Sequence, residues 1–282
     1  MTTEAGQAVV TALREDIDRL SAAEPEVRTD ADDSVHQMRV ATRRLRSVLR
    51  SYRELFDTGA AADTVTELKW LAELLGRARD AEVRAARFAD LLAAHAAVPA
   101  AVTDTLVGAA RAEYAAAHAE ILTALDSERY RRLREVLTTW RTDPPLAPGA
   151  AGADAGEAFE RVLRRDRKRL RKMVFAEPTA APAERVELLH DIRKGAKRLR
   201  YSCEAAGAVL GADATALGAR AKRLQSVLGD HRDAVESRAA ITAVATGPHA
   251  TFYEILADTE EAAAGAAIAH YPAAAAFISA AG

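Results

Sequence analysis

Hydrophobic residues recur along almost the whole chain at the i, i+3, i+4 spacing of amphipathic helices, and strand-like alternation of apolar and polar residues is absent. Alanine, leucine, arginine and glutamate, which favour helices, dominate the sequence. The pattern predicts an all-α fold. The predicted helices cover residues 8–20, 33–56, 61–75, 81–97, 101–125, 128–141, 157–174, 184–210, 214–228, 232–245 and 249–267.

Prolines, glycines and capping residues set the expected helix ends. The Pro25 region is expected to end the first helix, and Gly59 to close the second. Gly76 is expected to end the third, after which Asp80 caps the fourth. Pro99 marks the start of the next helix.

The segment DPPLAPGAAGADAG, residues 143–156, has the composition of an interdomain linker. It holds three prolines and three glycines and shows no apolar periodicity. We therefore predict an N-terminal helical half over residues 1–142, a linker over 143–156 and a C-terminal helical half over 157–282.

The helix predicted around Val35–Arg53 contains six arginines and one histidine and no acidic residue. Part of this set follows 3,4,3,4 spacing and falls on one side of a helix, within roughly an 80° arc. We call it the first stripe. Its members are His36, Arg39, Arg43, Arg46 and Arg50. The opposite side carries an apolar band wide enough to be buried, made of Met38, Ala41, Leu45, Val48, Leu49, Tyr52 and Phe56.

A solvated charged face is the simpler interpretation of such a stripe. Surface helices, however, usually mix signs to gain i, i+4 ion pairs, and this one does not. Arginines one turn apart repel each other unless an anion lies against them. The stripe therefore favours a site for an anionic ligand.

The two halves of the chain repeat each other. HQMRVATRRLR, residues 36–46, matches HDIRKGAKRLR, residues 190–200, with five of eleven residues identical at an offset of 154. KWLAELLGRARDA, residues 69–81, matches KRLQSVLGDHRDA, residues 222–234, with seven of thirteen identical at an offset of 153. The order and spacing predict a duplicated helical unit with pseudo-two-fold symmetry and a shared basic central surface.

The repeat defines a second stripe, His190, Arg193, Lys197 and Arg200. Helix packing has no use for these cations on the face away from the apolar band, so both stripes remain candidates for anion binding. The matched Gly229 and Asp233 are interpreted, like Gly76 and Asp80, as capping residues. Further cationic candidates with weaker support are Lys69, Arg79, Arg165, Lys168, Arg169, Lys172, Lys194, Arg198, Lys222 and Arg232.

Composition narrows the function classes. The net charge is −2, so the protein is not generally basic and its cations are concentrated in particular helices. The single cysteine excludes an intrachain disulfide and fits a reducing compartment. We see neither a secretory signal nor a membrane span and expect a cytoplasmic protein.

Three other functions agree less well with the sequence. A metal site is disfavoured because each stripe histidine has arginines one turn away and no paired carboxylates. A nucleic-acid module is electrostatically possible, but the basic helices carry almost no aromatics and no recognition motif. An enzyme acting on phosphates would need a P-loop or carboxylates for Mg²⁺, and neither is seen.

The paired HxxRxxx(R/K)RLR and LGxxRDA motifs, with the basic helix before the second pair, resemble the CHAD domain, the conserved-histidine α-helical domain. The resemblance covers essentially the whole chain and implies two helical bundles that bind inorganic polyphosphate without catalysis or a cofactor. It implies long-chain polyphosphate as partner, polyphosphate-granule proteins as further candidate partners, and a location at such granules. Glu204, where the repeat would place a partner for Arg50, makes the second stripe one turn shorter.

Overall fold

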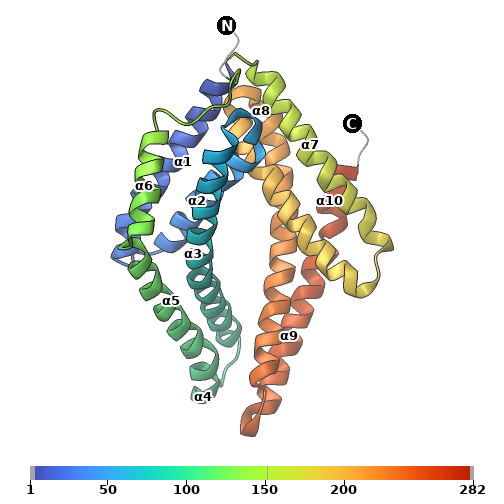
Figure 1. Cartoon of the computed structure of the whole chain (residues 1–282). Helices are drawn as coiled ribbons and strands as arrows, with labels where there is room; N and C mark the ends of the chain where they lie inside the picture. The colour runs from blue at the N-terminus through green and yellow to red at the C-terminus, as the bar shows by residue number, and fades with distance from the viewer. Residues whose placement is uncertain (1–3, 151, 280–282) are drawn as a thin grey trace. The chain divides into compact units, whose positions relative to one another are not determined.

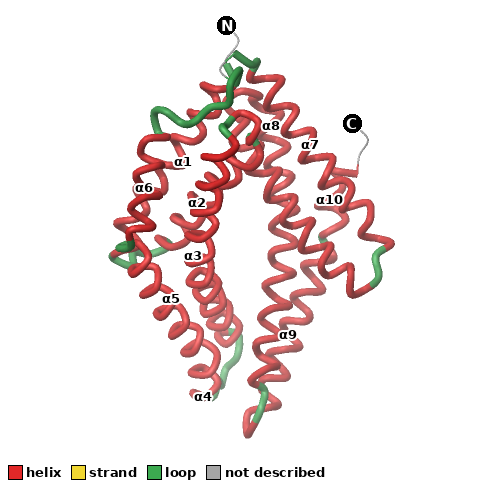
Figure 2. The backbone as a smooth tube through the Cα atoms, viewed as in Figure 1, coloured by secondary structure: helices red, strands yellow, loops and turns green. Residues whose placement is uncertain are grey.

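The computed structural model describes residues 4–150 and 152–279, and every regular element within these ranges is helical (Figures 1 and 2). The all-α prediction is confirmed. The α-helices are α1 (Ala5–Arg28), α2 (Ser34–Ser51), α3 (Thr58–Ala93), α4 (Ala100–Thr103), α5 (Ala109–Leu125), α6 (Glu128–Trp140), α7 (Ala155–Ala176), α8 (Pro182–Val244), α9 (Ala250–Ala269) and α10 (Tyr271–Ser279). Short 3-10 turns cover Arg53–Leu55, Glu177–Thr179 and Gly247–His249, and a π-helical turn covers Asp104–Gly108.

The chain forms two compact units, and each takes segments from both sides of residues 143–156. Unit 1 contains Met1–Arg79, Tyr114–Arg165 and Arg198–Gly218. Unit 2 contains Asp80–Glu113, Asp166–Lys197 and Ala219–Gly282. The division into two repeat halves therefore remains a prediction about the sequence, distinct from these units.

The apolar band of α2 lies in the core of unit 1. All seven of its predicted members, from Met38 to Phe56, are buried. The Tyr52 ring packs on Phe159 of α7 with 4.5 Å between centroids, and its hydroxyl donates a hydrogen bond of 2.8 Å to the carbonyl oxygen of Ser202. This packing fixes α2 by its apolar face, and the first stripe lies outside that face.

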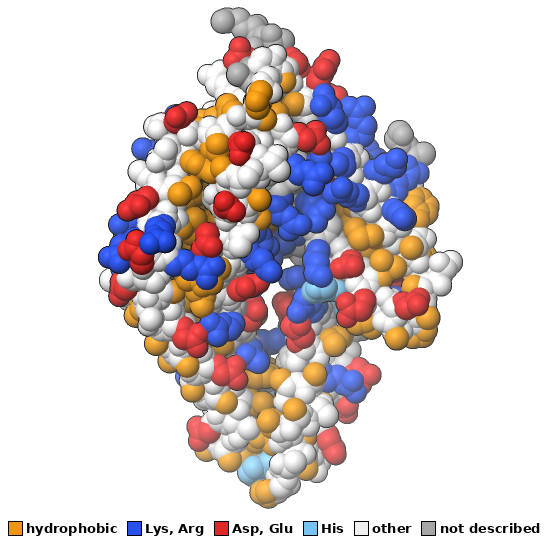
Figure 3. All heavy atoms as spheres, in the orientation of Figure 1, with side chains coloured by type: hydrophobic (Ala, Val, Ile, Leu, Met, Phe, Trp, Pro, Cys, Tyr) orange, Lys and Arg blue, Asp and Glu red, His pale blue; other side chains and the backbone are white. Residues whose placement is uncertain are grey.

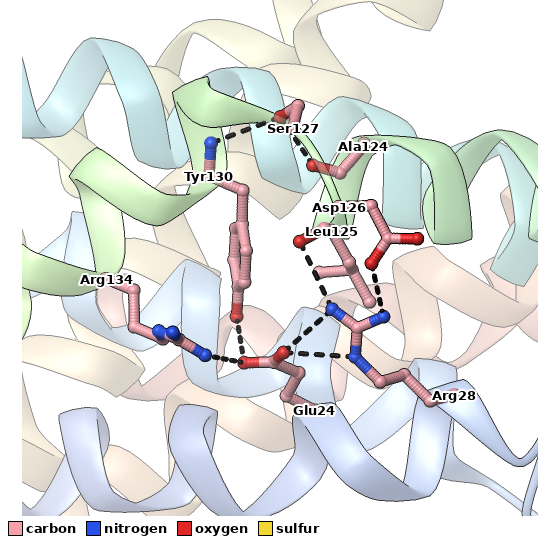
Figure 4. A network of polar contacts seen from close by, with 8 residues as sticks. All are labelled: Glu24, Arg28, Ala124, Leu125, Asp126, Ser127, Tyr130 and Arg134. Carbon is pink, nitrogen blue, oxygen red and sulfur yellow. Dashed lines mark hydrogen bonds and ion pairs between the residues drawn. The ribbon is translucent and has the colours of Figure 1, made fainter.

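A buried carboxylate also joins α1 to the α5–α6 turn within unit 1 (Figure 4). Glu24 accepts hydrogen bonds from the Tyr130 hydroxyl at 2.9 Å and from Arg28 Nε at 3.1 Å. Arg28 Nη1 also donates to Asp126 at 2.7 Å, and the Ser127 hydroxyl caps α6 by accepting from the Tyr130 amide at 3.2 Å. Burial and Glu24 raise the pKa of Tyr130, so it remains a hydrogen-bond donor at neutral pH.

The described residues of the predicted linker, 143–150 and 152–156, are held on unit 1 by backbone hydrogen bonds. The Asp57 amide donates to the carbonyl of Pro145 at 2.8 Å, and the Ala147 amide donates to Leu55 at 3.0 Å. At the other end, the Ala5 amide donates to Ala153 at 2.9 Å. These described residues are thus part of unit 1, and the last two of them, 155 and 156, already belong to α7.

Unit 2 has its own core, made by segments far apart in the sequence. Phe88 and Leu92 of α3 and Val102, Leu106 and Val107 of the α4 region pack with Ile241, Tyr253 and Leu256. Beside this core, Arg87 holds the buried Glu260 through both carboxylate oxygens, with 2.8 Å from Nε to Oε1. The Ser237 hydroxyl donates to the same Oε1 at 2.9 Å. Because the charge of Glu260 is paired and hydrogen-bonded, its burial is tolerated.

Several predicted helix ends are wrong. Helix α1 continues through Pro25 to Arg28, and Gly59 lies in the first turn of α3, whose first amides are capped by Asp57 instead. Helix α3 runs without a break through Gly76, and α8 runs through Gly229. Tertiary packing overrides the helix-breaking tendency of these glycines, and neither ends a helix.

By contrast, the predicted break between residues 210 and 214 is confirmed. Gly211 has φ 64° and ψ −137°, a conformation that glycine adopts without strain, and it interrupts α8. The two arms then face each other: a Cβ at Gly218 would lie 3.0 Å from Cys203 Cβ, and one at Gly207 would lie 4.0 Å from the Thr215 hydroxyl. Helix α8 is therefore a hairpin of two helical arms.

The C-terminal helical region, Gly247–Ser279, is long and apolar enough to cross a membrane by length and composition, a criterion that core helices also meet. Part of it, including Tyr253 and Leu256, packs in the core of unit 2. The expectation of no membrane span remains a prediction.

Candidate functional site

Helix α2 presents the first stripe at the border of its buried face. His36, Arg39, Arg43 and Arg46 are half-buried, and Arg50 at the last turn is exposed. From residue 36 to residue 50 the stripe extends over about 21 Å, at 1.5 Å per residue. The cations are therefore held by packing along a defined line on unit 1.

Arg39 lies against Gly76 of α3, which is buried in unit 1. A Cβ atom at position 76 would lie 3.6 Å from Arg39 Nη2 and 3.7 Å from its Nε. The guanidinium group therefore occupies the space that a side chain on this turn of α3 would fill.

Further along the stripe, Arg46 and Arg50 act on each other as like charges. Burial, and after it the charge of Arg50, lowers the pKa of Arg46, against the opposing influence of Glu73. Arginine nevertheless stays protonated at neutral pH. In the described part of unit 1, neither Arg46 nor Arg50 makes a hydrogen bond or ion pair, and Glu73 offsets the unfavourable influences on Arg46 only in part. A bound anion would therefore reduce the repulsion between the two arginines.

Arg44, the arginine of α2 outside the stripe, belongs to a different group of charges. Its Nε lies 3.0 Å from Asp16 Oδ1, and its Nη1 lies 3.1 Å from Glu204 Oε2. Glu204 also meets Arg200 Nε at 3.1 Å. Burial raises the pKa of Asp16, while Arg44 and Arg19 oppose the shift. This network balances its charges internally, and it engages Arg200, one of the strongest sequence candidates, with a carboxylate.

In unit 2, His190 is held by an arginine from the other arm of α8. Arg232 Nη1 lies 2.8 Å from His190 Nδ1, and since arginine only donates, this nitrogen accepts and the imidazole is neutral with its proton on Nε2. Burial lowers the pKa of His190, and Lys194, Arg232 and Arg193 lower it further. Arg232 Nε donates in turn to Glu236 at 2.6 Å.

Arg193 repeats the arrangement of Arg39. A Cβ atom on the buried Gly229 would lie 3.6 Å from Arg193 Nε and 3.9 Å from its Nη2. Asp233, one turn beyond Gly229, is half-buried; burial raises its pKa and the charge of Arg193 opposes that shift. The LGxxRDA motif thus places a glycine and a carboxylate beside the motif arginine.

These contacts correct the interpretation of Gly76, Gly229 and Asp233 as capping residues. The two glycines lie inside continuous helices and face arginines, and Asp233 interacts with Arg193 in the middle of an arm of α8. Asp80 is likewise inside α3. In the sequence, these contacts could have been suspected from a glycine inside a strongly helical pattern at the matched positions 76 and 229.

The basic helix α7 contains two kinds of cation. Arg165 donates through Nη1 to Glu54 at 3.1 Å and through Nη2 to the Ser51 carbonyl, which ties it to the end of α2 in unit 1. Lys168, Arg169 and Lys172 are exposed. Figure 3 shows Lys and Arg side chains gathered over α7. Arg165 is therefore positioned for packing, whereas the other three offer charge to solvent.

The remaining candidates are placed as follows. Lys69 Nζ lies 3.6 Å from Glu73, Arg79 Nη1 lies 3.5 Å from Asp33, and Lys194 Nζ lies 3.1 Å from Asp191. Lys197 and Arg198 are half-buried, and Lys222 is exposed. The boundary between the units falls between Lys197 and Arg198, so the second stripe contributes residues to both units.

Metal ligands do not converge in residues 4–150 and 152–279: no group of three or more His, Cys, Asp and Glu side chains there could hold an ion. The acids beside the stripes meet arginines instead, as Glu204 meets Arg200 and Glu236 meets Arg232. The arrangement is suited to binding oxygen anions.

Two solved structures share this fold. PptA from Streptomyces chartreusis superposes with a TM-score of 0.79 at 22% identity, covering 96% of this chain and 99% of that one. The CHAD domain from the plant Ricinus communis gives a TM-score of 0.70 at 24% identity, covering 100% of this chain and 93% of that one.

Sequence similarity identifies the family more specifically than the shared fold does. The uncharacterized protein Rv2226 of Mycobacterium tuberculosis is 39% identical over 234 residues, which cover 80% of this chain and 43% of that protein. The chain thus spans less than half the length of this curated relative. The sequence pattern of the CHAD domain matches residues 11–242. With the fold and these matches together, the chain belongs to the CHAD domain family.

Proposed function

We propose that this chain binds inorganic polyphosphate, without catalysis, through the cations of its two stripes. The observation that carries the proposal is the repeated setting of Arg39 on Gly76 and Arg193 on Gly229. In each motif a half-buried arginine is held against a neighbouring helix turn, in line with further cations of the same stripe. Polyphosphate binding, the property expected of CHAD domains, fits this arrangement.

The chemistry of the ligand explains the residue types. Polyphosphate has no bases to read, so recognition depends on its phosphate oxygens, which accept hydrogen bonds from guanidinium, ammonium and imidazole groups. Cations one helical turn apart repeat every 5.4 Å or so, a spacing that suits a chain of closely spaced charges. Arg46 and Arg50 repel each other in the free protein, so a bound phosphate would relieve that repulsion.

We propose that no reaction follows binding, because Glu204 and Glu236 are engaged by arginines and are poor ligands for Mg²⁺. The exposed Lys168, Arg169 and Lys172 of α7 are proposed as additional contacts for long polyphosphate chains. Proteins of polyphosphate granules are the proposed further partners, and the cytoplasm the proposed location.

The test is direct titration of the full chain with long-chain polyphosphate, with and without EDTA. We expect metal-independent binding in the micromolar range or tighter, with log K falling linearly as log salt rises, as for other polyanions. Charge reversal of both Arg39 and Arg193 to Glu should abolish binding while the helical circular dichroism signal is kept.

The matched control is Arg132→Glu, because Arg132 is an exposed arginine of α6 outside both stripes. It should bind like the wild type. Equal or stronger binding of duplex DNA at matched phosphate concentration would instead indicate a nucleic-acid module, and phosphate release by the pure protein with Mg²⁺ would indicate an enzyme. Either result would overturn the proposal.

A further inference from the structure

Two glycines occupy buried positions in the interior of long helices, where glycine lowers helix stability relative to alanine. Gly76 lies in the 36-residue α3, and Gly229 lies in the second arm of α8. Neither ends a helix or has a positive φ. Backbone conformation therefore does not account for a residue without a long side chain at either position.

The surroundings of the glycines supply one. At Gly76 the nearest atoms are Arg39 Nη2 and Nε, and at Gly229 they are Arg193 Nε and Nη2. At no other described glycine between residues 59 and 265 does an arginine side chain lie among the nearest atoms. Gly195, for comparison, faces the apolar side chains of Met173 and Leu170, so its role is ordinary packing.

We propose that Gly76 and Gly229 are positioning residues for polyphosphate binding: at each position a residue no larger than alanine leaves room for the guanidinium of Arg39 or Arg193 against the helix turn. The inference rests on the proposed function and identifies what fixes its two central arginines. A methyl group at 76 would lie 3.6 Å from Arg39, an ordinary contact, whereas a longer side chain would take the space of the guanidinium.

The contact occurs twice, independently. Arg39 and Gly76 both belong to unit 1, and Arg193 and Gly229 both belong to unit 2. Each arginine is the fourth residue of its HxxR motif, and each glycine belongs to an LGxxRDA motif. The same pair of residue types thus forms the same contact in two separately packed units.

Confinement matters because an arginine side chain otherwise loses much rotamer freedom when it binds an anion. A guanidinium already confined against a helix turn presents its planar fork of donors in fewer orientations, and preorganised groups bind with less entropic cost. In unit 2 the arrangement also includes Asp233, whose charge interacts with Arg193 one turn from Gly229. Gly229 leaves the space that the guanidinium of Arg193 occupies, and the negative charge of Asp233 favours the positive charge of Arg193 there.

The experiment compares Gly76→Leu, Gly229→Leu, Gly76→Ala and Gly229→Ala in the full chain. Each leucine variant should lower the affinity for long-chain polyphosphate about tenfold and reduce the slope of log K against log salt by about one, the loss of one phosphate contact. The alanine variants should bind within about twofold of wild type, because a methyl group leaves the arginine in place.

The control for leucine in a helix is Gly265→Leu, since Gly265 lies inside α9 and a Cβ atom added there would meet nothing within 4 Å. It should bind like wild type. A second control removes the arginine: in an Arg39→Ala background the leucine at 76 has room, so it should fold and weaken binding no further. The ¹⁵Nε resonance of Arg39 should shift in Gly76→Leu even without ligand.

The outcomes separate the two proposals. If the wild type binds polyphosphate and both leucine variants bind equally well, the glycines are not positioning residues and the proposed function stands. Additive losses in the Arg39→Ala background would also overturn the inference, because the glycine would then act apart from the arginine. If the wild type does not bind polyphosphate, the proposed function fails, and an unshifted Arg39 resonance would refute the positioning role as well.

Discussion

The two stripes carry the same motif but differ in how their charges are balanced. In the first stripe, Arg46 and Arg50 are adjacent like charges. In the second, Arg200 meets Glu204, and His190 accepts a hydrogen bond from Arg232, which is itself joined to Glu236. The HxxRxxx(R/K)RLR motif determines the positions of the cations, whereas the neighbouring acidic residues determine how much positive charge is available to a ligand.

Single charge reversals should expose this difference most strongly. We expect Arg39→Glu to weaken polyphosphate binding about 100-fold and Arg193→Glu about tenfold. Each reversal places a repulsive charge at the phosphate chain, and the first stripe also holds Arg46 and Arg50, whose like charges favour an anion beside them. Isothermal titration at fixed salt measures both. Equal losses would show that the neighbouring acids do not matter.

Removing a balancing acid should act in the opposite direction. In Glu204→Gln, Arg200 loses its carboxylate partner while Arg44 keeps Asp16, so polyphosphate binding should tighten. The expected gain is roughly two- to fivefold, the factor that corresponds to an ion pair of about 0.5–1 kcal/mol. The matched control is Glu15→Gln, which removes an exposed acid of α1 that pairs with Arg19, outside both stripes. Weaker binding by Glu204→Gln would mean that Glu204 orients Arg200 for the ligand.

The smallest expected effect is on pH dependence, and it belongs to the second stripe. The pKa of His190 is lowered in the folded protein, so the stability it contributes is present above its unfolded pKa of about 6.5 and is lost as pH falls through the lowered value. A bound polyanion favours the protonated ring, so affinity should rise roughly threefold from pH 7.5 to 5.5. Across this pH range, melting temperatures measure the change in stability and titrations with polyphosphate measure the change in affinity.

His190→Gln should remove the His190 part of both effects. His270→Gln is the control, because His270 is exposed on unit 2 and outside the stripes. If the pH dependence of stability and affinity is unchanged in His190→Gln, the group that takes up the proton is not His190. The groups that face His190 are Lys194, Arg193 and Asp191 on its own arm and Arg232 on the other.

Much of the fold could be predicted from residue pattern alone. The apolar band of α2 and the core residues Tyr130, Leu133, Leu137 and Trp140 of α6 are buried as their spacing indicates. Helix ends were less predictable, because Pro25 and Gly76 have local preferences that packing in the folded chain overrides. Gly211 did break α8, since there no packing opposes the turn: a Cβ atom added to it would meet nothing within 4 Å.

The site was predictable in position but not in detail. Periodicity and the internal repeat identified both stripes, and Arg39, Arg43 and Arg46 share the half-buried face of α2. The partners of Arg165 and Arg200 could not be read from spacing, because Glu54 reaches Arg165 across 111 residues of sequence. The contact of Arg39 with Gly76 likewise joins two helices that the linear pattern treats separately.

The reversal of α8 at Gly211 has a consequence for the lengths that its two arms can have. Arg193 and Gly229 are each 18 residues from Gly211, and His190 and Arg232 are each 21 residues from it. A residue inserted into one arm would rotate everything beyond it by about 100° and shift it by about 1.5 Å, moving Arg193 away from Gly229. Insertions and deletions in this hairpin are therefore tolerable only in matched pairs, one in each arm.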